Sequence, residues 1–255
     1  MSGIYSLLSA AKTQERNLEV TSNNLANVNT NGFKADKAVF REFLKDAKAT
    51  SPNSYEGGLK HDEFLSPYLK GATRYAITEE VISDMQPGTY QLTENSYDLA
   101  IKGKGFFSVS TPTGTRYTKD GAFQRSADGF LIDAVGNFVL GTNGKINVSG
   151  EKLNITSDGL VQVDDNFVDQ LRIVGFDDPS RLTKAGKSYY VANKAQPVLP
   201  LTKEFSIHQG MLEKSNTSLV KEMLNLITAE RSFQAVQRGI KTIDSIDEQS
   251  LRLAR

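Results

Sequence analysis

The sequence predicts an α+β protein in which N- and C-terminal helices form an antiparallel coiled-coil stalk, with a central antiparallel β-domain between them. Three observations predict this fold class. Apolar residues recur every seven positions near the N-terminus, a long amphipathic stretch fills the C-terminus, and short β-type runs separated by turn dipeptides lie between them. The 255 residues suffice for one large domain or two modest ones.

The first predicted helix follows a heptad-like seam. Two interleaved sets of positions make up this seam: Ile4, Ala11, Leu18 and Leu25, then Leu7, Thr21 and Val28. Such spacing is typical of a helix that packs along one face. The seam ends in a cluster of turn formers that closes with Asn31 and Gly32, a pair that favours positive φ. We therefore predict an N-terminal assembly helix within residues 1–34.

The same N-terminal residues also resemble the apolar core of a signal peptide. However, no basic residue precedes Ile4, serines interrupt the run, and Lys12 follows it directly. The helix is the better interpretation. No apolar run in the sequence approaches the roughly 20 residues that span a bilayer, so we expect no membrane insertion.

The second predicted helix lies in the C-terminal assembly segment, residues 206–255. Its apolar stripe advances in steps of three and four residues: Leu219, Met223, Leu226, Phe233, Ile240 and Ile243, broadened by Val220, Leu224, Ile227, Val236 and Ile246. No proline follows Pro200. A helix of roughly 35 to 40 residues would be about 55 Å long, which one small domain cannot cover.

The middle of the chain reads as an antiparallel β-domain over residues 96–205. Apolar positions alternate along residues 99–110. Turn dipeptides then follow at short intervals: Asp120-Gly121, Asp128-Gly129, Gly136-Asn137, Asn143-Gly144 and Asp158-Gly159. Residues 35–95 show little periodicity, and we predict an irregular arm with one or two strands there.

The terminal helices lead into and out of this β-domain, so they pack antiparallel if they pack on each other. A stalk of two helices buries only part of each apolar stripe. We expect identical stalks of neighbouring subunits to cover the remainder, through a heterologous contact that propagates into a ring or helical array.

Composition excludes several classes of function. Thirty Lys plus Arg balance thirty Asp plus Glu, and no basic stripe is visible, so nucleic-acid binding is not expected. Zero net charge also favours self-association, because like subunits do not repel each other strongly. The chain has no cysteine, which excludes disulfides and thiolate chemistry.

The sequence holds no pattern of catalytic or metal-ligating residues, and we predict neither an enzyme nor a cofactor. His61 and His208 lie in separate segments without acidic partners at ligand spacing. Gly103-Lys104-Gly105 precedes a strand instead of a helix, which favours a strand kink over a phosphate loop. In the following strand, Phe106 and Phe107 point to opposite faces, so we expect one ring in the core and the other at an interface.

Several ordered motifs resemble those of the bacterial flagellar rod and hook protein family. They cover both ends and most of the middle: residues 22–34, 98–107, 117–123, 128–129, 210–216, 222–223 and 231–233. Within the family, the chain length, residues 3–5 and residues 243–249 are most similar to the proximal rod (FlgF) type, with the distal rod (FlgG) type as the alternative.

The resemblance implies a structural, self-assembling subunit of the rod, the drive shaft of the flagellum. It implies a periplasmic location in the basal body, and export by the flagellar export apparatus without a cleaved signal peptide. Other rod subunits and further copies of the chain are the implied partners. The family's terminal helices form its inner layer and its β-domain the outer layer.

Three asparagines give the sharpest local hypothesis about assembly. Asn23 and Asn24 lie inside the predicted helix, where asparagine lowers helix propensity, and Asn27 ends it. A buried asparagine beside a seam can fix its register, so we predict that all three bond across subunits. Ordinary surface asparagines are the alternative. The predicted assembly interface therefore contains Ile4, Leu7, Ala11, Leu18, Asn23, Asn24, Leu25, Asn27, Leu219, Met223, Leu226, Phe233, Ile240 and Ile243.

Two other classes of function compete with a structural subunit. A secreted binding module or adhesin would present the β-domain, but as a monomer it would leave both apolar stripes uncovered. A glycan-cleaving enzyme needs a carboxylate pair, and the sequence identifies none.

Overall fold

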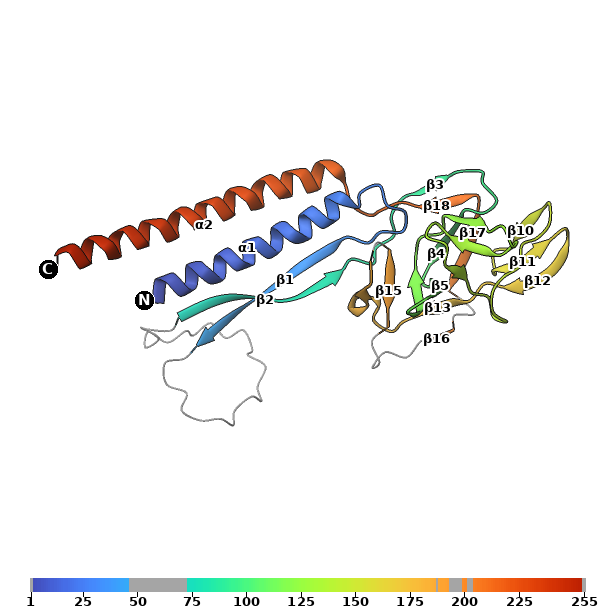
Figure 1. Cartoon of the computed structure of the whole chain (residues 1–255), viewed down its shortest axis with the longest axis horizontal. Helices are drawn as coiled ribbons and strands as arrows, with labels where there is room; N and C mark the ends of the chain where they lie inside the picture. Colours follow the sequence, from blue (N-terminus) through green and yellow to red (C-terminus); the bar gives the residue numbers. More distant parts are fainter. Residues whose placement is uncertain (1, 46–72, 187, 193–198, 201–203, 254–255) are drawn as a thin grey trace, which may run out of the picture. The chain divides into compact units, whose positions relative to one another are not determined.

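The computed structural model describes residues 2–45, 73–186, 188–192, 199–200 and 204–253 (Figure 1). The chain divides into two compact units. The helical unit comprises Met1–Thr21, Ala38–Val81 and Leu224–Arg255, and the β unit comprises Ser22–Lys37 and Ile82–Met223.

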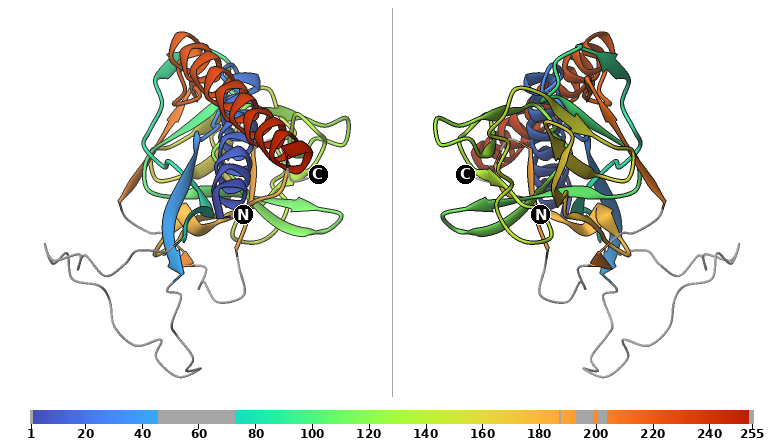
Figure 2. Two further views of the ribbon diagram at one scale, coloured as in Figure 1. Left: turned by 90° about the vertical axis from the view of Figure 1, so that its left-hand side faces the viewer. Right: turned by 90° about the vertical axis from the view of Figure 1, so that its right-hand side faces the viewer.

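Both predicted terminal helices are present. The first, α1, spans Ser2–Ala26, and the second, α2, spans Leu219–Leu253 and contains 35 residues, the length expected from the sequence. Within the helical unit the two helices run in opposite directions, with the N- and C-termini at the same end (Figures 1 and 2). A Cβ atom added to Gly239 of α2 would lie 3.6 Å from the side chain of Leu7 in α1, so the helices are in contact there.

The helical unit also contains most of a two-stranded sheet, formed by β1 (Asp36–Lys45) and β2 (Thr73–Ser83). The sequence predicts an irregular arm with one or two strands here, and these two strands are long and regular. Their sequences show no clear alternation of apolar and polar residues, which is why periodicity does not reveal these strands. The predicted arm residues 46–72 and His61 lie outside the described residues.

The β unit is antiparallel, as predicted, and a nine-stranded sheet forms its centre. Its strands are β5 (Phe106–Thr111), β6 (Gly114–Thr118), β7 (Phe123–Arg125), β8 (Leu131–Asp133), β9 (Phe138–Val139), β13 (Ile173–Gly175), β14 (Thr183–Lys184), β15 (Tyr189–Val191) and β16 (Leu199–Pro200). A short 3-10 helix at Pro179–Arg181 precedes β14.

Three smaller sheets complete this unit. The strands β10 (Leu153–Ile155), β11 (Leu160–Val163) and β12 (Asn166–Gln170) form one sheet, β4 (Leu99–Gly103) pairs with β17 (Phe205–Gln209), and β3 (Tyr90–Leu92) pairs with β18 (Met211–Glu213). The last two strands, β17 and β18, therefore bring the chain segment before α2 into the β unit.

The core of the β unit lies in two clusters on opposite faces of β5. Phe107, fully buried, belongs to the larger cluster with residues such as Leu99, Leu131 and Val161. Phe106 belongs to the smaller one, where its ring makes edge-to-face contacts with Phe176 and Tyr190. The two rings point to opposite faces as predicted. The expectation that one of them lies at an interface is wrong, because both are at least 97% buried within the chain.

The predicted strand kink lies between β4 and β5. Gly103 has φ +99°, and a Cβ atom there would lie 2.5 Å from the carbonyl oxygen of Glu204. A side chain would strain the backbone and collide with the neighbouring segment. The glycine therefore lets two backbones approach closely, and it does not open a phosphate-binding loop.

Candidate assembly surfaces and the motif junction

One face of α2 is packed within the helical unit. Its members are half-buried or buried and follow alternating steps of three and four residues: Leu226, Ala229, Phe233, Val236, Ile240 and Ile243. Ala229 is only 3% exposed. Alternating steps of three and four produce a seam that follows one side of a helix, and we call these six residues the packed face.

A second apolar face of α2 is exposed. It lies in the first turns of the helix and consists of Leu219, Val220, Met223, Leu224 and Ile227, which we call the exposed face. Their exposed fractions run from 45% for Ile227 to 67% for Val220. Exposed apolar side chains that gather on one helix face mark a surface for association more often than scattered ones do.

The predicted interface residues thus divide between different environments. Leu7, Ala11, Leu18 and Leu25 of α1 are half-buried, as are Leu226, Phe233, Ile240 and Ile243 of α2. Leu219 and Met223 are exposed, at 51% and 48%. Ile4 lies in α1, in the first turns of the helix. The apolar residues of α2, which the sequence analysis treated as one stripe, therefore form two separate faces in the structure.

The asparagines of the N-terminal motif bond within the chain. The Asn24 side chain is 4% exposed; its Nδ2 donates to the Asp36 carbonyl oxygen at 2.9 Å, and its Oδ1 accepts from the Asp36 backbone N–H at 2.8 Å. This pair of bonds joins the end of α1 to the start of β1. Asn27 Nδ2 donates to the Asn23 carbonyl oxygen at 2.9 Å, while Asn23 itself is exposed.

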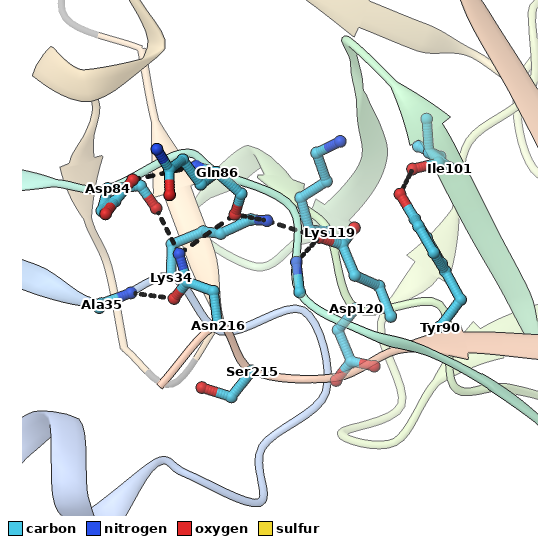
Figure 3. A network of polar contacts seen from close by, with 12 residues as sticks. Lys34, Ala35, Asp84, Gln86, Tyr90, Ile101, Lys119, Asp120, Ser215 and Asn216 are labelled. Atoms are coloured by element: carbon cyan, nitrogen blue, oxygen red, sulfur yellow. Dashed lines mark hydrogen bonds and ion pairs between the residues drawn. The ribbon is translucent and has the colours of Figure 1, made fainter. Parts of the chain in front are cut away.

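Four of the sequence motifs meet at one place in the β unit, which we call the motif junction (Figure 3). Its centre is an ion pair between Lys34 Nζ and Glu213 Oε1 at 2.5 Å, with both side chains 1% exposed. Lys34 Nζ also donates to the Gln86 carbonyl oxygen at 2.8 Å, and Glu213 Oε1 accepts from the Gly88 N–H at 3.1 Å. Removing one partner of such a pair leaves an uncompensated buried charge.

Asn216 adds a second set of bonds at the motif junction. Its Oδ1 accepts from the Ala35 N–H at 2.8 Å, and its Nδ2 donates to the carbonyl oxygens of Asp84 at 2.9 Å and Gln86 at 3.1 Å. One amide thus joins the segment after α1, the segment after β2 and the segment before α2 (Figure 3). The start and the end of the β unit are fixed to each other by this network.

The conformation and surroundings of Gly32 show why the N-terminal motif has a glycine after Asn31. Its φ is +64°, and a Cβ atom there would lie 2.4 Å from the backbone nitrogen of Asp120. Its N–H donates to the Glu213 carbonyl oxygen at 2.7 Å. The backbone at Gly32 is therefore in direct contact with the loop after β6, where only glycine fits.

Two neighbouring charged groups of that loop have shifted pKa values. Burial lowers the pKa of Lys119 to about 8; the charge of Glu213 opposes this shift and that of Lys34 adds to it. Burial also raises the pKa of Asp120 to about 6, against a hydrogen bond from the Ala122 N–H that favours its ionised form. Both shifts follow from the cost of charging a group away from water.

Sequence reasoning did not single out Lys34, Glu213 or Lys119. All three lie in motifs shared with the rod and hook family. No periodic pattern connects residues 34, 119 and 213, because their contacts depend on the antiparallel pairing of distant strands. Within the described parts of the chain, no three His, Cys, Asp or Glu side chains gather in a way that could hold a metal ion. Neither described helix is long and apolar enough to cross a membrane.

Comparison with protein families places three models along the chain. Residues 4–34 match the flagella basal body rod protein model, residues 100–163 match the flagellar hook protein FlgE/F/G D1 domain, and residues 208–253 match the flagellar basal body rod FlgEFG protein C-terminal model. The flagellar basal-body rod protein FlgF of Caulobacter vibrioides is 32% identical over 92% of this chain and 90% of its own length.

The chain belongs to the flagellar basal-body rod protein family.

Rod proteins of both named types are similar to it. The FlgG protein of Buchnera aphidicola (subsp. Schizaphis graminum) is also 32% identical, over 91% of this chain and 92% of its own length. The FlgG protein of Bacillus subtilis is 30% identical over 99% of this chain and 98% of its own length. Identity therefore does not separate the FlgF type from the FlgG type.

Proposed function

We propose that this structural subunit of the flagellar rod self-assembles through its terminal helices and occupies the proximal segment of the rod. The observation that carries the assembly proposal is the division of α2 into a packed face and an exposed face. Covering the exposed face on assembly would contribute on the order of 1 kcal/mol for each half-exposed side chain.

The packed face supports an intramolecular stalk. Its alternating steps are those of a coiled coil, and α2 contacts α1 where Gly239 meets Leu7. A full antiparallel coiled coil would form when neighbouring subunits cover the remaining positions of both helices. We keep the predicted interface residues in this proposal, with the exception of Asn24. Both the Nδ2 and the Oδ1 atoms of Asn24 already form hydrogen bonds with the Asp36 backbone. The exposed Asn23 remains available to a neighbour.

Other rod subunits and copies of the chain are the proposed partners, and the periplasmic part of the basal body is the proposed location. The chain would reach it through the flagellar export apparatus without a cleaved signal peptide. The role is mechanical and involves no catalytic step, membrane insertion or nucleic acid. The motif junction supports it, because a buried network resists shear between the two ends of the β unit.

The assembly proposal is tested in a strain that lacks the gene for this chain. Reintroducing the wild-type gene should restore swimming and complete basal bodies. A gene carrying Leu224→Asp and Ile227→Asp should not restore them, although the purified variant keeps its helix content. Normal motility from this double variant would contradict assembly through the exposed face.

The proximal position needs a separate test. The sequence of both chain ends supports it. If the proposal holds, basal bodies from a strain without the distal rod subunit should still contain this chain. If the chain is missing from them, it belongs to the distal segment instead.

A further inference from the structure

The tripeptide Thr-Asn-Gly occurs twice in the β unit, at residues 30–32 and 142–144. An asparagine followed by glycine can lose its side-chain amide without an enzyme, because glycine has no side chain to hinder attack by its own backbone nitrogen. The following residue is Phe33 in one case and Lys145 in the other. Since the reacting residues are identical at the two sites, a large difference in their reactivity would come from the fold.

This reaction requires a glycine N–H that is free to react and in contact with water. The glycine nitrogen loses its proton to solvent and forms a bond to Cγ of the asparagine, and the Cγ–Nδ2 bond breaks so that ammonia leaves. Water then opens the resulting succinimide ring and gives aspartate or isoaspartate. A glycine N–H that is held in a buried hydrogen bond reacts only after that part of the fold opens, so its asparagine is converted slowly.

The first site is closed by the motif junction. Gly32 is buried, and its N–H donates to the Glu213 carbonyl oxygen at 2.7 Å. The Asn31 side chain is held as well, because its Oδ1 accepts from Lys214 Nζ at 3.0 Å. Both partners belong to the segment before α2. Reaction at Asn31 therefore requires this segment to separate from the segment after α1.

The second site is open. Asn143 is exposed, and within the described residues the Gly144 N–H has no hydrogen-bond partner. A Cβ atom added to Gly144 would have no atom within 4 Å, so solvent reaches this residue. The Asn143 Nδ2 donates to Asp169 Oδ1 at 3.0 Å, and the reaction itself breaks this bond when ammonia leaves. Attack by the Gly144 nitrogen therefore requires no opening of the fold.

We propose that Asn143 is a site of spontaneous deamidation in this protein, whereas the motif junction protects Asn31. Water is the reactant, and the reaction needs no other co-reactant. The inference goes beyond the proposed rod function and does not rest on it.

Deamidation at Asn143 would also loosen the loop that contains it. Asp169 of β12 is 5% exposed, and it accepts from the Asn143 Nδ2 and from the Asn143 backbone N–H, the latter at 3.2 Å. The product has a carboxylate in place of the donating amide, so a hydrogen bond is lost and like charges face each other. The loop after β9 would then be held less firmly against β12.

Peptide mapping of the full-length chain tests the site. The purified protein is incubated in mildly alkaline buffer, and mass spectrometry measures aspartate and isoaspartate at residues 31 and 143 over time. We expect conversion at Asn143 to be at least about 10-fold faster than at Asn31, because only Asn31 must wait for local opening. Rates that differ by less than about twofold in the folded chain would overturn the proposal.

The same chain in denaturant is the matched control. Unfolding removes the bonds of Gly32 and Asn31, so the two asparagines should convert at rates within about threefold of each other. If Asn143 keeps its full advantage in the denatured chain, the difference comes from neighbouring sequence and the protection assigned to the motif junction is wrong.

Asn143→Asp reproduces one product of the reaction and tests its consequence. We expect backbone hydrogen exchange in residues 141–145 to become roughly 10-fold faster than in wild type. Asn147→Asp is the control, because Asn147 is also exposed and its Oδ1 accepts from the Ser149 N–H at 2.8 Å, a bond that a carboxylate can also accept. Equal exchange in the two variants would show that the Asp169 bond does not hold the loop.

Discussion

The two units of this chain bury their apolar residues in different ways. The β unit has a core of fully buried side chains such as Phe107, Leu131 and Val161, and its two ends meet in a buried ion pair. In the helical unit, the packed face of α2 is mostly half-buried, and Leu224 and Ile227 of the exposed face are open to solvent. The β unit therefore has the interior of an independent fold, whereas α2 keeps apolar side chains exposed to solvent. A subunit of this kind can keep its β unit folded before assembly and add helix packing on assembly.

The largest expected effect comes from breaking the ion pair of the motif junction. Lys34→Met leaves Glu213 charged and buried, and we expect it to lower the free energy of unfolding of the β unit by about 3–5 kcal/mol. Urea unfolding followed by tyrosine fluorescence measures this. Adding Glu213→Leu should recover part of the loss, because the unpaired charge is removed. Lys104→Met, at an exposed ion pair, should cost below about 1 kcal/mol. Equal losses for Lys34→Met and Lys104→Met would contradict the role given to the junction.

A smaller effect is expected at Gly32. Gly32→Ala forces a side chain into a left-handed conformation and against the Asp120 backbone, so we expect a loss of about 2–3 kcal/mol in the unfolding free energy of the β unit. Gly136→Ala is the control, because Gly136 has φ +99° but no atom within 4 Å of the added Cβ. It should lose only the backbone contribution, about 1 kcal/mol. A control loss as large as that of Gly32→Ala would show that contact with Asp120 is unimportant.

The stability of the β unit should also depend on pH through Lys119. Its folded pKa of about 8 lies below the ordinary lysine value of 10.5, so between these values the unfolded chain binds the proton and the folded chain does not. Stability contributed by this group therefore rises with pH from about 8 to 10.5, by at most about 1.4 kcal/mol per pH unit. Thermal unfolding of wild type and Lys119→Met across this range measures it. A wild-type slope that Lys119→Met does not reduce would refute the assignment.

The contribution of Asp120 to the stability of the β unit changes with pH in the opposite direction, and it does so at lower pH. Its folded pKa of about 6 lies above the ordinary aspartate value of 3.8, so between these values the folded chain binds the proton more tightly than the unfolded chain. The contribution of this group is fully present below pH 3.8 and is lost as pH rises through 6. Asp120→Asn should remove this part of the pH dependence. The measurement is the unfolding free energy of wild type and variant at several pH values from 4 to 6.5. If the difference between the two proteins stays constant over this range, the prediction is wrong.

The smallest effect on stability is expected on the exposed face of α2. Leu224→Ser should change the unfolding free energy of the monomer by less than about 0.5 kcal/mol, because residue 224 is 61% exposed. Ile240→Ser, on the packed face, should cost about 1 kcal/mol. Helix content measured by circular dichroism during urea unfolding separates the two. Similar losses would mean that α2 has one apolar environment and not two.

The sequence alone predicted the two terminal helices and the antiparallel β-domain between them, but not the long strands β1 and β2. Heptad spacing predicted α1, the proline-free stripe predicted α2 at nearly its observed length, and the turn dipeptides predicted the antiparallel hairpins. These signals are local, since helix periodicity and turn chemistry depend on residues within a few positions of each other. The ordered motifs also indicated the rod family, which the similarity to known rod proteins confirmed.

Only the tertiary structure decided which side chains act together. It divided the stripe of α2 into two faces, bonded Asn24 to Asp36, and buried both Phe106 and Phe107. It also brought Lys34 to Glu213, residues separated by 179 positions. Such contacts depend on strand register and on how distant segments pair, so no local pattern of residues specifies them.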